Sequence, residues 1–275
     1  MAIYGEYATL NDVLTNYIGD SNTGQNTLLL SLIRSVSRDI DAAAGGRHFY
    51  PLNETRYYDT PAGRELKLCT DLLAVTTFTN GYGSVIASSD YNLLPYNWTP
   101  YNALRLKETS AVTWYADSNS NYERSLSVAG VWGYHPLYAH AWPETGATLA
   151  AAITTTSATT FTCTTGIVKA GDLLKVDSEY VYASSVSVST SDTVTCIRGV
   201  NGSTAATHVI SSILYRWWTP EINELCVEAV VAKKNLKDNP VGETVRVGDG
   251  VFHTPKDVNA YIRARLHGLG VMRVT

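Results

Sequence analysis

The sequence predicts an α+β fold in which a small helical bundle, built from both ends of the chain, has β-rich modules inserted between its halves. Helix-period patterns fill residues 9–44 and 219–269. The stretch between them is rich in Thr, Ser, Tyr, Val and Gly, and its apolar residues alternate as in strands. We therefore expect three parts: a helical core from residues 1–46 and 217–275, a β module at 47–144, and a small inserted β module at 145–216.

Two helices are expected near the N-terminus. Thr9 and Asp12 have the spacing of a capping box, so the first helix should begin there and end at Gly19. Its apolar face consists of Val13, Leu14, Tyr17 and Ile18. The second helix should end at Gly45 and Gly46. Its apolar face consists of Leu29, Leu32, Ile33, Val36, Ile40 and Ala43.

Two more helices are expected near the C-terminus. Thr219 followed by Pro220 is a start signal, and acids lead while lysines trail in the helix that follows, as the helix dipole favours. Its apolar residues are Ile222, Leu225, Cys226, Ala229 and Val230. Thr254 and Pro255 repeat the start signal for a fourth helix, whose apolar residues are Val258, Tyr261, Ile262, Leu266 and Leu269. Four short amphipathic helices predict a small bundle.

Short strands are expected through the middle of the chain. In the first β module they are residues 55–59, 65–69, 73–78, 85–87, 103–106, 111–115 and 125–132. Asn80 and Gly81 are residues typical of a tight hairpin turn. The second module contains a Thr-rich run, residues 153–165, whose β-branched residues favour strands over disorder.

Composition narrows the possible functions. The net charge of −4, with 17% charged residues, argues against a dedicated nucleic-acid binder, which would need a basic stripe, so any DNA contact should be local. No signal peptide or membrane span is predicted, which favours a soluble protein inside a cell. Neither a zinc site nor a redox dithiol is suggested by the four separated cysteines, Cys69, Cys163, Cys196 and Cys226.

Basic residues on the predicted helices have two interpretations. They can be a solvated face, which is the default for exposed charge on an amphipathic helix, or a contact face; the residues are Arg34, Arg38, Lys233, Lys234 and Lys237. From Val258 onward the chain has arginines and no acid, and it ends in an apolar run. The tail can therefore be an ordinary helix end or a docking arm formed by Arg263, Arg265, Val271, Met272, Arg273 and Val274.

Catalytic chemistry is poorly supported by the residue pattern. Asp177 and Glu179 share one face of a strand, and with His208 they could hold a cation or act as acid and base. Ordinary ion pairs on the wet face of the strand, beside Arg198, are the alternative. No Ser lies in a GxSxG motif, and no Gly-rich turn has the frame of a phosphate-binding loop. We expect no enzymatic activity, cofactor or resident metal.

Aromatic residues are the remaining signal, since the chain has 18 Tyr and 6 Trp. One cluster surrounds two prolines and consists of Tyr91, Tyr96, Trp98 and Tyr101. It can be a carbohydrate platform or an interface hot spot, or it can be packing within a β module.

The order of these pieces resembles the head-to-tail connector, or adaptor, proteins of tailed bacteriophages. The segments that carry the resemblance are residues 30–49, 55–59, 66–68, 71–76, 90–95 and 128–134. In addition, Asp177-x-Glu179 and Arg198-Gly199-x-x-Gly202 look like a small β module that recurs in phage structural proteins. The inserted module departs from the compact members of the family.

The resemblance implies a ring, usually of twelve copies, between the portal and the tail. In such a ring the helices line the DNA channel, so the resemblance implies that their basic residues face the channel or a neighbouring subunit. The C-terminal arm reaches the portal, and a further neck or tail-completion protein follows. The expected location is the neck of the virion, assembled in the host cytoplasm, without a membrane. A carbohydrate- or receptor-binding virion protein that uses the Tyr- and Trp-rich β modules stays open as the alternative.

Overall fold

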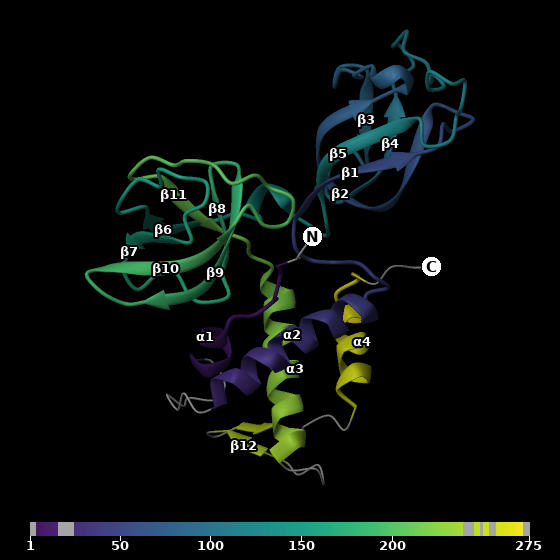
Figure 1. The fold of residues 1–275 in the computed structure, drawn as a ribbon. Helices are drawn as coiled ribbons and strands as arrows, with labels where there is room; N and C mark the ends of the chain where they lie inside the picture. Colours follow the sequence, from purple (N-terminus) through teal and green to yellow (C-terminus); the bar gives the residue numbers. More distant parts are fainter. Residues whose placement is uncertain (1–3, 16–24, 239–244, 248–249, 253–256, 272–275) are drawn as a thin grey trace. The chain divides into compact units, whose positions relative to one another are not determined.

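The computed structural model describes residues 4–15, 25–238, 245–247, 250–252 and 257–271. The chain forms two compact units, drawn as a ribbon in Figure 1. The first unit combines the two ends of the chain, Met1–Phe49 and Ala141–Thr275. The second unit is the continuous segment Tyr50–His140.

The predicted fold class is wrong, because the described residues are mostly β. They form a five-stranded and a six-stranded antiparallel sheet, and helices are the smaller part. Hydrophobic periodicity is a local signal, so it found helices at both ends but could not show which elements supply the main cores. Large buried clusters lie on both sheets. The protein is therefore a β protein with helices added, not a helical bundle opened by inserts.

The sheet of the first unit has the strand order β6-β11-β8-β9-β10-β7. Its strands are β6 (Glu144–Thr148), β7 (Thr160–Thr164), β8 (Leu173–Val176), β9 (Glu179–Ser187), β10 (Ser191–Arg198) and β11 (Ile213–Arg216). The two edge strands approach each other through a bridge between Leu149 and Cys163. The sheet is therefore curled towards a closed form.

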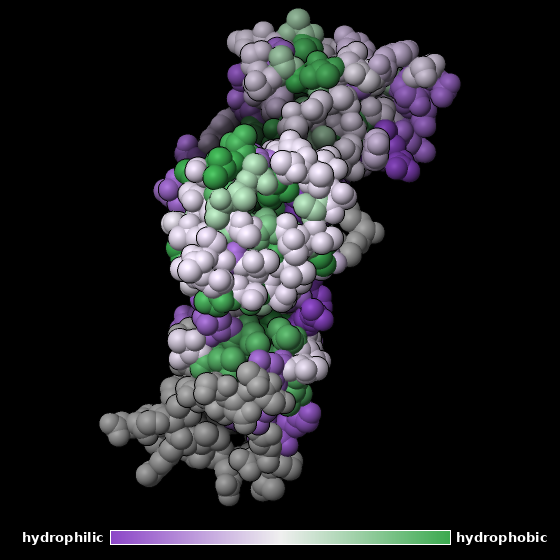
Figure 2. Space-filling model, turned by 60° about the vertical axis from the view of Figure 1, so that its left-hand side comes forward, coloured by the Kyte–Doolittle hydropathy of each residue, from purple (hydrophilic) through white to green (hydrophobic). Residues whose placement is uncertain are grey.

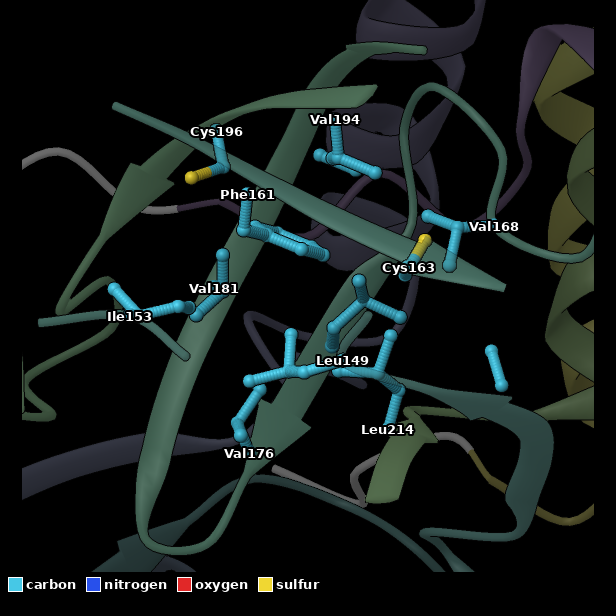
Figure 3. Packing of buried hydrophobic residues seen from close by; sticks show 13 residues of the cluster. Leu149, Ile153, Phe161, Cys163, Val168, Val176, Val181, Val194, Cys196 and Leu214 are labelled. Carbon is cyan, nitrogen blue, oxygen red and sulfur yellow. The ribbon is translucent and has the colours of Figure 1, made fainter. Parts of the chain in front are cut away.

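The core of this sheet explains the Thr-rich sequence. Val194 and Cys196 of β10 are buried, whereas Thr193 and Thr195, which alternate with them, are exposed, as the two-residue period of a strand requires. Figure 3 shows Val194, Cys196 and Phe161 of β7 among the side chains that fill this core. The surface of the six-stranded sheet is pale in Figure 2, because the Thr and Ser side chains that face outward are close to neutral in hydropathy. Of the Thr-rich run, residues 153–165, only Thr160–Thr164 form a strand, β7, and residues 154–159 form a turn before it.

The helices agree locally with the sequence patterns. They are α1 (Leu10–Val13), α2 (Asn26–Ala43), α3 (Pro220–Asp238) and α4 (Val258–Gly268), and a hairpin of β12 (Val245–Val247) and β13 (Gly250–Phe252) lies between the last two along the chain. The capping box of Thr9 and Asp12 is confirmed. Asp257, not Thr254, caps α4, because its side chain accepts from the Asn259 and Ala260 amides. Throughout the described ranges, each helix is too short or too polar to cross a lipid bilayer.

Three of these helices, α2, α3 and α4, contact one another within the first unit. Their buried face includes Leu29, Ile33, Val36, Ile40, Leu225, Val230, Ile262 and Leu266. One polar residue lies inside: the Ser37 hydroxyl donates to the Ile33 carbonyl at 2.8 Å and is 3.7 Å from the Cys226 sulfur. Burial raises the pKa of Cys226 to about 12, so this thiol stays protonated.

The sheet of the second unit has the order β1-β5-β2-β4-β3. Its strands are β1 (Leu52–Tyr58), β2 (Glu65–Thr79), β3 (Tyr91–Leu94), β4 (Tyr101–Leu106) and β5 (Leu126–Trp132). The two strands expected at 65–69 and 73–78 are one long strand, β2, which pairs with β4 at one end and with β5 at the other. Residues 111–115 form no strand, and 85–87 contribute only a bridge from Val85 to Thr79.

The core of the second unit is centred on Trp132, which is fully buried. Its indole nitrogen donates to the Glu54 carbonyl at 3.0 Å, and the Arg56 guanidinium lies 4.3 Å from the ring centroid. Close to it, Gly130 lets β5 approach β2. A Cβ atom at Gly130 would lie 2.2 Å from the Ala74 carbonyl oxygen.

We expect Gly130→Ala to destabilise the second unit by about 3 kcal/mol, because the clash is with backbone and no side chain can move aside. Gly63→Ala is the matched control, since a Cβ there meets nothing within 4 Å, and it should change stability by less than about 0.5 kcal/mol. Urea unfolding followed by tryptophan fluorescence measures both. Equal midpoints for the two variants would show that β5 and β2 are not this close.

Candidate functional site

The N-terminal segment, residues 4–9, is anchored on α2 through Tyr7. The Tyr7 amide donates to the Ser37 hydroxyl at 3.1 Å, and its phenol donates to Asp41 while accepting from the Phe49 amide at 2.8 Å. Burial raises the pKa of Asp41 to about 6. Each polar group of Tyr7 is therefore used to fix the chain.

The same segment also reaches the six-stranded sheet. The Tyr4 amide donates to the Asn201 side chain at 2.8 Å, and the Asn201 amide group donates back to the Tyr4 carbonyl at 2.6 Å. The Tyr4 ring packs on Tyr182 of β9, with centroids 4.8 Å apart. On the helical side, Asn223 of α3 donates to the Tyr7 carbonyl at 2.9 Å. One short segment thus bonds to two helices and to the sheet.

Arg34 and Arg38, predicted as a channel-facing or intersubunit face, lie one turn apart on α2 beside this segment. Arg34 pairs with Glu6 at 3.2 Å, and Arg38 pairs with Asp41 at 2.9 Å. Their side chains are 65% and 48% exposed, so both remain accessible to a partner. The pKa of Arg34 is raised above its usual value, mainly by its hydrogen bond with the Tyr182 hydroxyl and next by the charge of Glu6. Both guanidinium groups hold the N-terminal segment and also reach the surface.

A groove of about 750 Å³ lies between the N-terminal segment, α2, β9 and β10. Its lining includes Tyr4, Glu6, Leu30, Arg34, Tyr182 and Ile197. Figure 2 shows apolar and charged side chains side by side at the level of α1 and α2. Ile197 of β10 is 38% exposed and lines the groove. We call this surface the α2–β10 groove.

The chemistry of the α2–β10 groove suits docking of a protein surface. Its charges are already paired, its walls are held by hydrogen bonds, and its floor offers apolar contacts. Paired arginines at the rim of such a groove fix the orientation of a docked partner more than they raise its affinity. Sequence reasoning identified Arg34 but missed Tyr182 and Ile197, because nothing in the alternation of β9 and β10 shows that a distant helix lies over them.

The predicted basic residues of α3 are not gathered into one site. Lys233 pairs with Asp39 of α2 and so links the two helices. Lys234 is partly buried, and Lys237 is exposed in the last turn of the helix. A single exposed lysine with its neighbours paired gives only a weak positive potential there.

The predicted docking arm is only partly described. Arg263 is exposed on α4, and Arg265 pairs with Glu228 of α3 at 3.3 Å, so an acid from another helix balances it. Val271 is 7% exposed, and its carbonyl accepts from Arg47, so it belongs to the folded unit and not to a free apolar edge. Met272, Arg273 and Val274 lie outside the described residues.

Asp177, Glu179 and His208 come together in the six-stranded sheet, as their spacing suggested. The two ring nitrogens of His208 lie 2.7 Å from Asp177 and 2.8 Å from Glu179. Arg198 donates twice to Glu179, each time at 2.6 Å, and the amides of Gly199 and Ala206 donate to it at 3.0 Å. The expected ion pair with Arg198 is present, but the expectation of a wet strand face is wrong for Glu179, which has no exposed surface.

This cluster is an ion-pair network that closes a loop onto the strands. Burial would raise the pKa of Glu179, but hydrogen bonds from Arg198, Ala206 and His208 outweigh it and hold the pKa below its usual value. Glu179 already accepts from Arg198 and from two backbone amides. Within the described ranges, no group of three or more His, Cys, Asp and Glu side chains is arranged to hold a metal ion.

The aromatic cluster divides between core and surface. Tyr91 packs edge-on against Phe78, with centroids 5.4 Å apart, and Tyr101 packs against the same core. Tyr96 and Trp98 are each 63% exposed. The four residues therefore do not form one platform.

Comparisons with known proteins do not assign the chain to a family. No protein-family model matches the chain, and no curated protein sequence matches it.

We expect Glu179→Gln to destabilise the first unit by roughly 3–5 kcal/mol at neutral pH, because it leaves the buried Arg198 charge without its partner. Asp177→Asn is the control: this side chain is 66% exposed, so the change should cost less than about 1 kcal/mol. Because the folded pKa of Glu179 is lowered, its contribution is present above the ordinary pKa near 4.5 and is lost as the pH falls below it. Chemical unfolding across pH should thus give stability curves for the wild type and the Glu179→Gln variant that converge as the pH falls below 4.5, and a difference independent of pH would contradict the assignment.

Proposed function

We propose that the chain is a structural subunit of a closed ring, usually of twelve copies, at the neck of a tailed-phage virion. The ring joins the portal of the head to the next neck or tail-completion protein and surrounds the DNA channel. In support, the segments behind the resemblance lie in regular elements: residues 30–49 are mainly α2, and 55–59, 71–76 and 128–134 lie almost entirely in the neighbouring strands β1, β2 and β5.

The α2–β10 groove is the observation that carries this proposal. A ring closes through heterologous contacts, in which one surface of each copy receives a different surface of the next copy. The groove is concave, is held by hydrogen bonds from the N-terminal segment, and presents Ile197 and Leu30 to an incoming apolar group. Its occupant in this proposal is a second copy of the chain.

The charge of the helices suits passing contact with double-stranded DNA. Lys233 of α3 is paired with Asp39, so few counterions would be released there on binding a phosphate backbone. Tight binding would hinder genome ejection, whereas a weakly charged channel wall allows DNA to slide.

Portal docking in this proposal uses the exposed face of α4 and the tail that follows it. Arg263 is the exposed cation on that face, and Arg265 is 39% exposed beside Glu228. Steering of the two proteins by such rim charges would make docking sensitive to salt.

We expect Ile197→Glu to reduce the fraction of protein in rings at least tenfold, because a charge in the apolar floor of the groove must be desolvated on docking. Native mass spectrometry and electron microscopy of the purified chain measure the ring fraction. The matched control is Ile213→Glu: Ile213 lies on β11 of the same sheet, outside the groove, and is 39% exposed against 38% for Ile197.

Circular dichroism should show both variants folded, since both side chains are already at the surface. If the two variants assemble equally, the groove is not the subunit interface. The ring proposal itself is wrong if the wild-type chain stays monomeric in solution at all concentrations and also forms no ring on portal-bearing heads.

A further inference from the structure

A second hollow, of about 440 Å³, lies on the outer face of the five-stranded sheet in the second unit. Its floor is a row of three residues in register across three strands: Tyr57 of β1, Ser127 of β5 and Thr79 of β2. The neighbouring Leu126 and Val128 point into the core, so this row faces solvent. The volume is within the range of small-molecule sites, roughly 300–1,000 Å³.

Two tyrosine rings at this hollow are more than half exposed. Tyr57 is 55% exposed and Tyr82 is 67% exposed. An exposed aromatic ring forgoes the stabilisation that burial provides, and two of them at one polar hollow indicate a surface kept for contact.

The backbone around the hollow is strained. Tyr82 has φ of 63° and Arg124 has φ of 53°, a region that side chains of this size rarely adopt. Both conformations are enforced. The buried Asn80 side chain accepts from the Gly81 and Tyr115 amides at 3.0 and 2.9 Å, and Asp59 accepts from the Arg124 amide at 2.8 Å. Strain of this kind is retained where it aims a functional side chain.

The polar groups beside the rings are still available. Arg124 lies 5.1 Å from the Tyr57 ring centroid, and within the described residues its guanidinium makes no ion pair. Asp117 uses Oδ1 to accept from the Asn119 and Asn121 amides, at 2.8 and 2.9 Å, which fixes its orientation. Its Oδ2 makes no hydrogen bond with the described residues.

We propose that this hollow, the Tyr57–Tyr82 pocket, binds one or two neutral hexose units of a glycan. A pyranose ring has an apolar C–H face, which the exposed Tyr82 ring can stack against, and hydroxyls that both donate and accept. Arg124 supplies donors and Asp117 supplies an acceptor for adjacent hydroxyls, with the strength of charge-assisted bonds. This binding is separate from the ring assembly proposed above and does not depend on it.

A nucleotide is the competing ligand, because tyrosine and arginine also stack on bases. The charges disfavour it. Asp117 lines the pocket, and the one arginine there is Arg124, so a phosphate would meet one cation and one anion. A neutral sugar can bind both groups, because its hydroxyls donate to the Asp117 carboxylate and accept from the Arg124 guanidinium.

The test uses the full chain and four methyl glycosides, those of glucose, galactose, mannose and N-acetylglucosamine, with a five-residue oligothymidine as the competing probe. Saturation-transfer NMR detects binding, and titration of each ligand into the protein measures its dissociation constant. Tyr82→Asn removes the ring and leaves a residue that tolerates this φ, and Arg124→Asn does the same for the guanidinium. We expect binding of at least one glycoside, weakened at least tenfold by either substitution.

Tyr96→Asn is the matched control, since Tyr96 is 63% exposed on the same unit and does not line the pocket. It should leave binding unchanged. Thermal unfolding should show Tyr82→Asn at least as stable as the wild type, which separates lost contacts from lost structure. Binding of none of the four glycosides, equal loss with Tyr96→Asn, or oligothymidine bound in preference would each overturn the proposal.

Discussion

The first unit depends on the hydrogen bonds of Tyr7. Residues far apart along the chain, Ser37, Asp41, Phe49 and Asn223, all bond to this one tyrosine. Three residues earlier, Tyr4 bonds to Asn201 beside the six-stranded sheet. Because most of these groups are buried, removing one partner would leave another unsatisfied at the cost of its full desolvation. The helices and the six-stranded sheet therefore fold as one body through a segment of only a few residues.

Local structure was predictable from the sequence where a signal lies within one turn or one strand. The helix α2, with its apolar residues at helical spacing and its terminal glycines, is one case, and the capping box at Thr9 is another. The strand ending in Trp132 was also found nearly in full. In each case the determining contacts are close in sequence.

The balance of the fold was not predictable in the same way. The long strand β2 was divided in two because Thr70 and Asp71 interrupt its apolar pattern, although pairing with both β4 and β5 holds it together. Asp177, Glu179 and His208 were placed near one another correctly, yet the burial of Glu179 and His208 depends on Arg198 and on a loop that returns over them. Tyr182 and Ile197 gained their importance only from a helix that lies far earlier in the sequence.

The approach of the edge strands β6 and β7 has a consequence for behaviour at high concentration. An open sheet presents rows of unpaired amide and carbonyl groups to which another chain can add a strand, and growth of that kind has no natural end. Here the Ala150 amide donates to the Thr162 carbonyl at 2.9 Å, and Leu149 bridges to Cys163, so part of each row is consumed inside the molecule. At this sheet, fewer backbone groups are left for strand addition, so contact between copies there depends more on side-chain shape. Association through side-chain shape can stop at a closed assembly with a fixed number of copies, whereas strand addition leads to fibres.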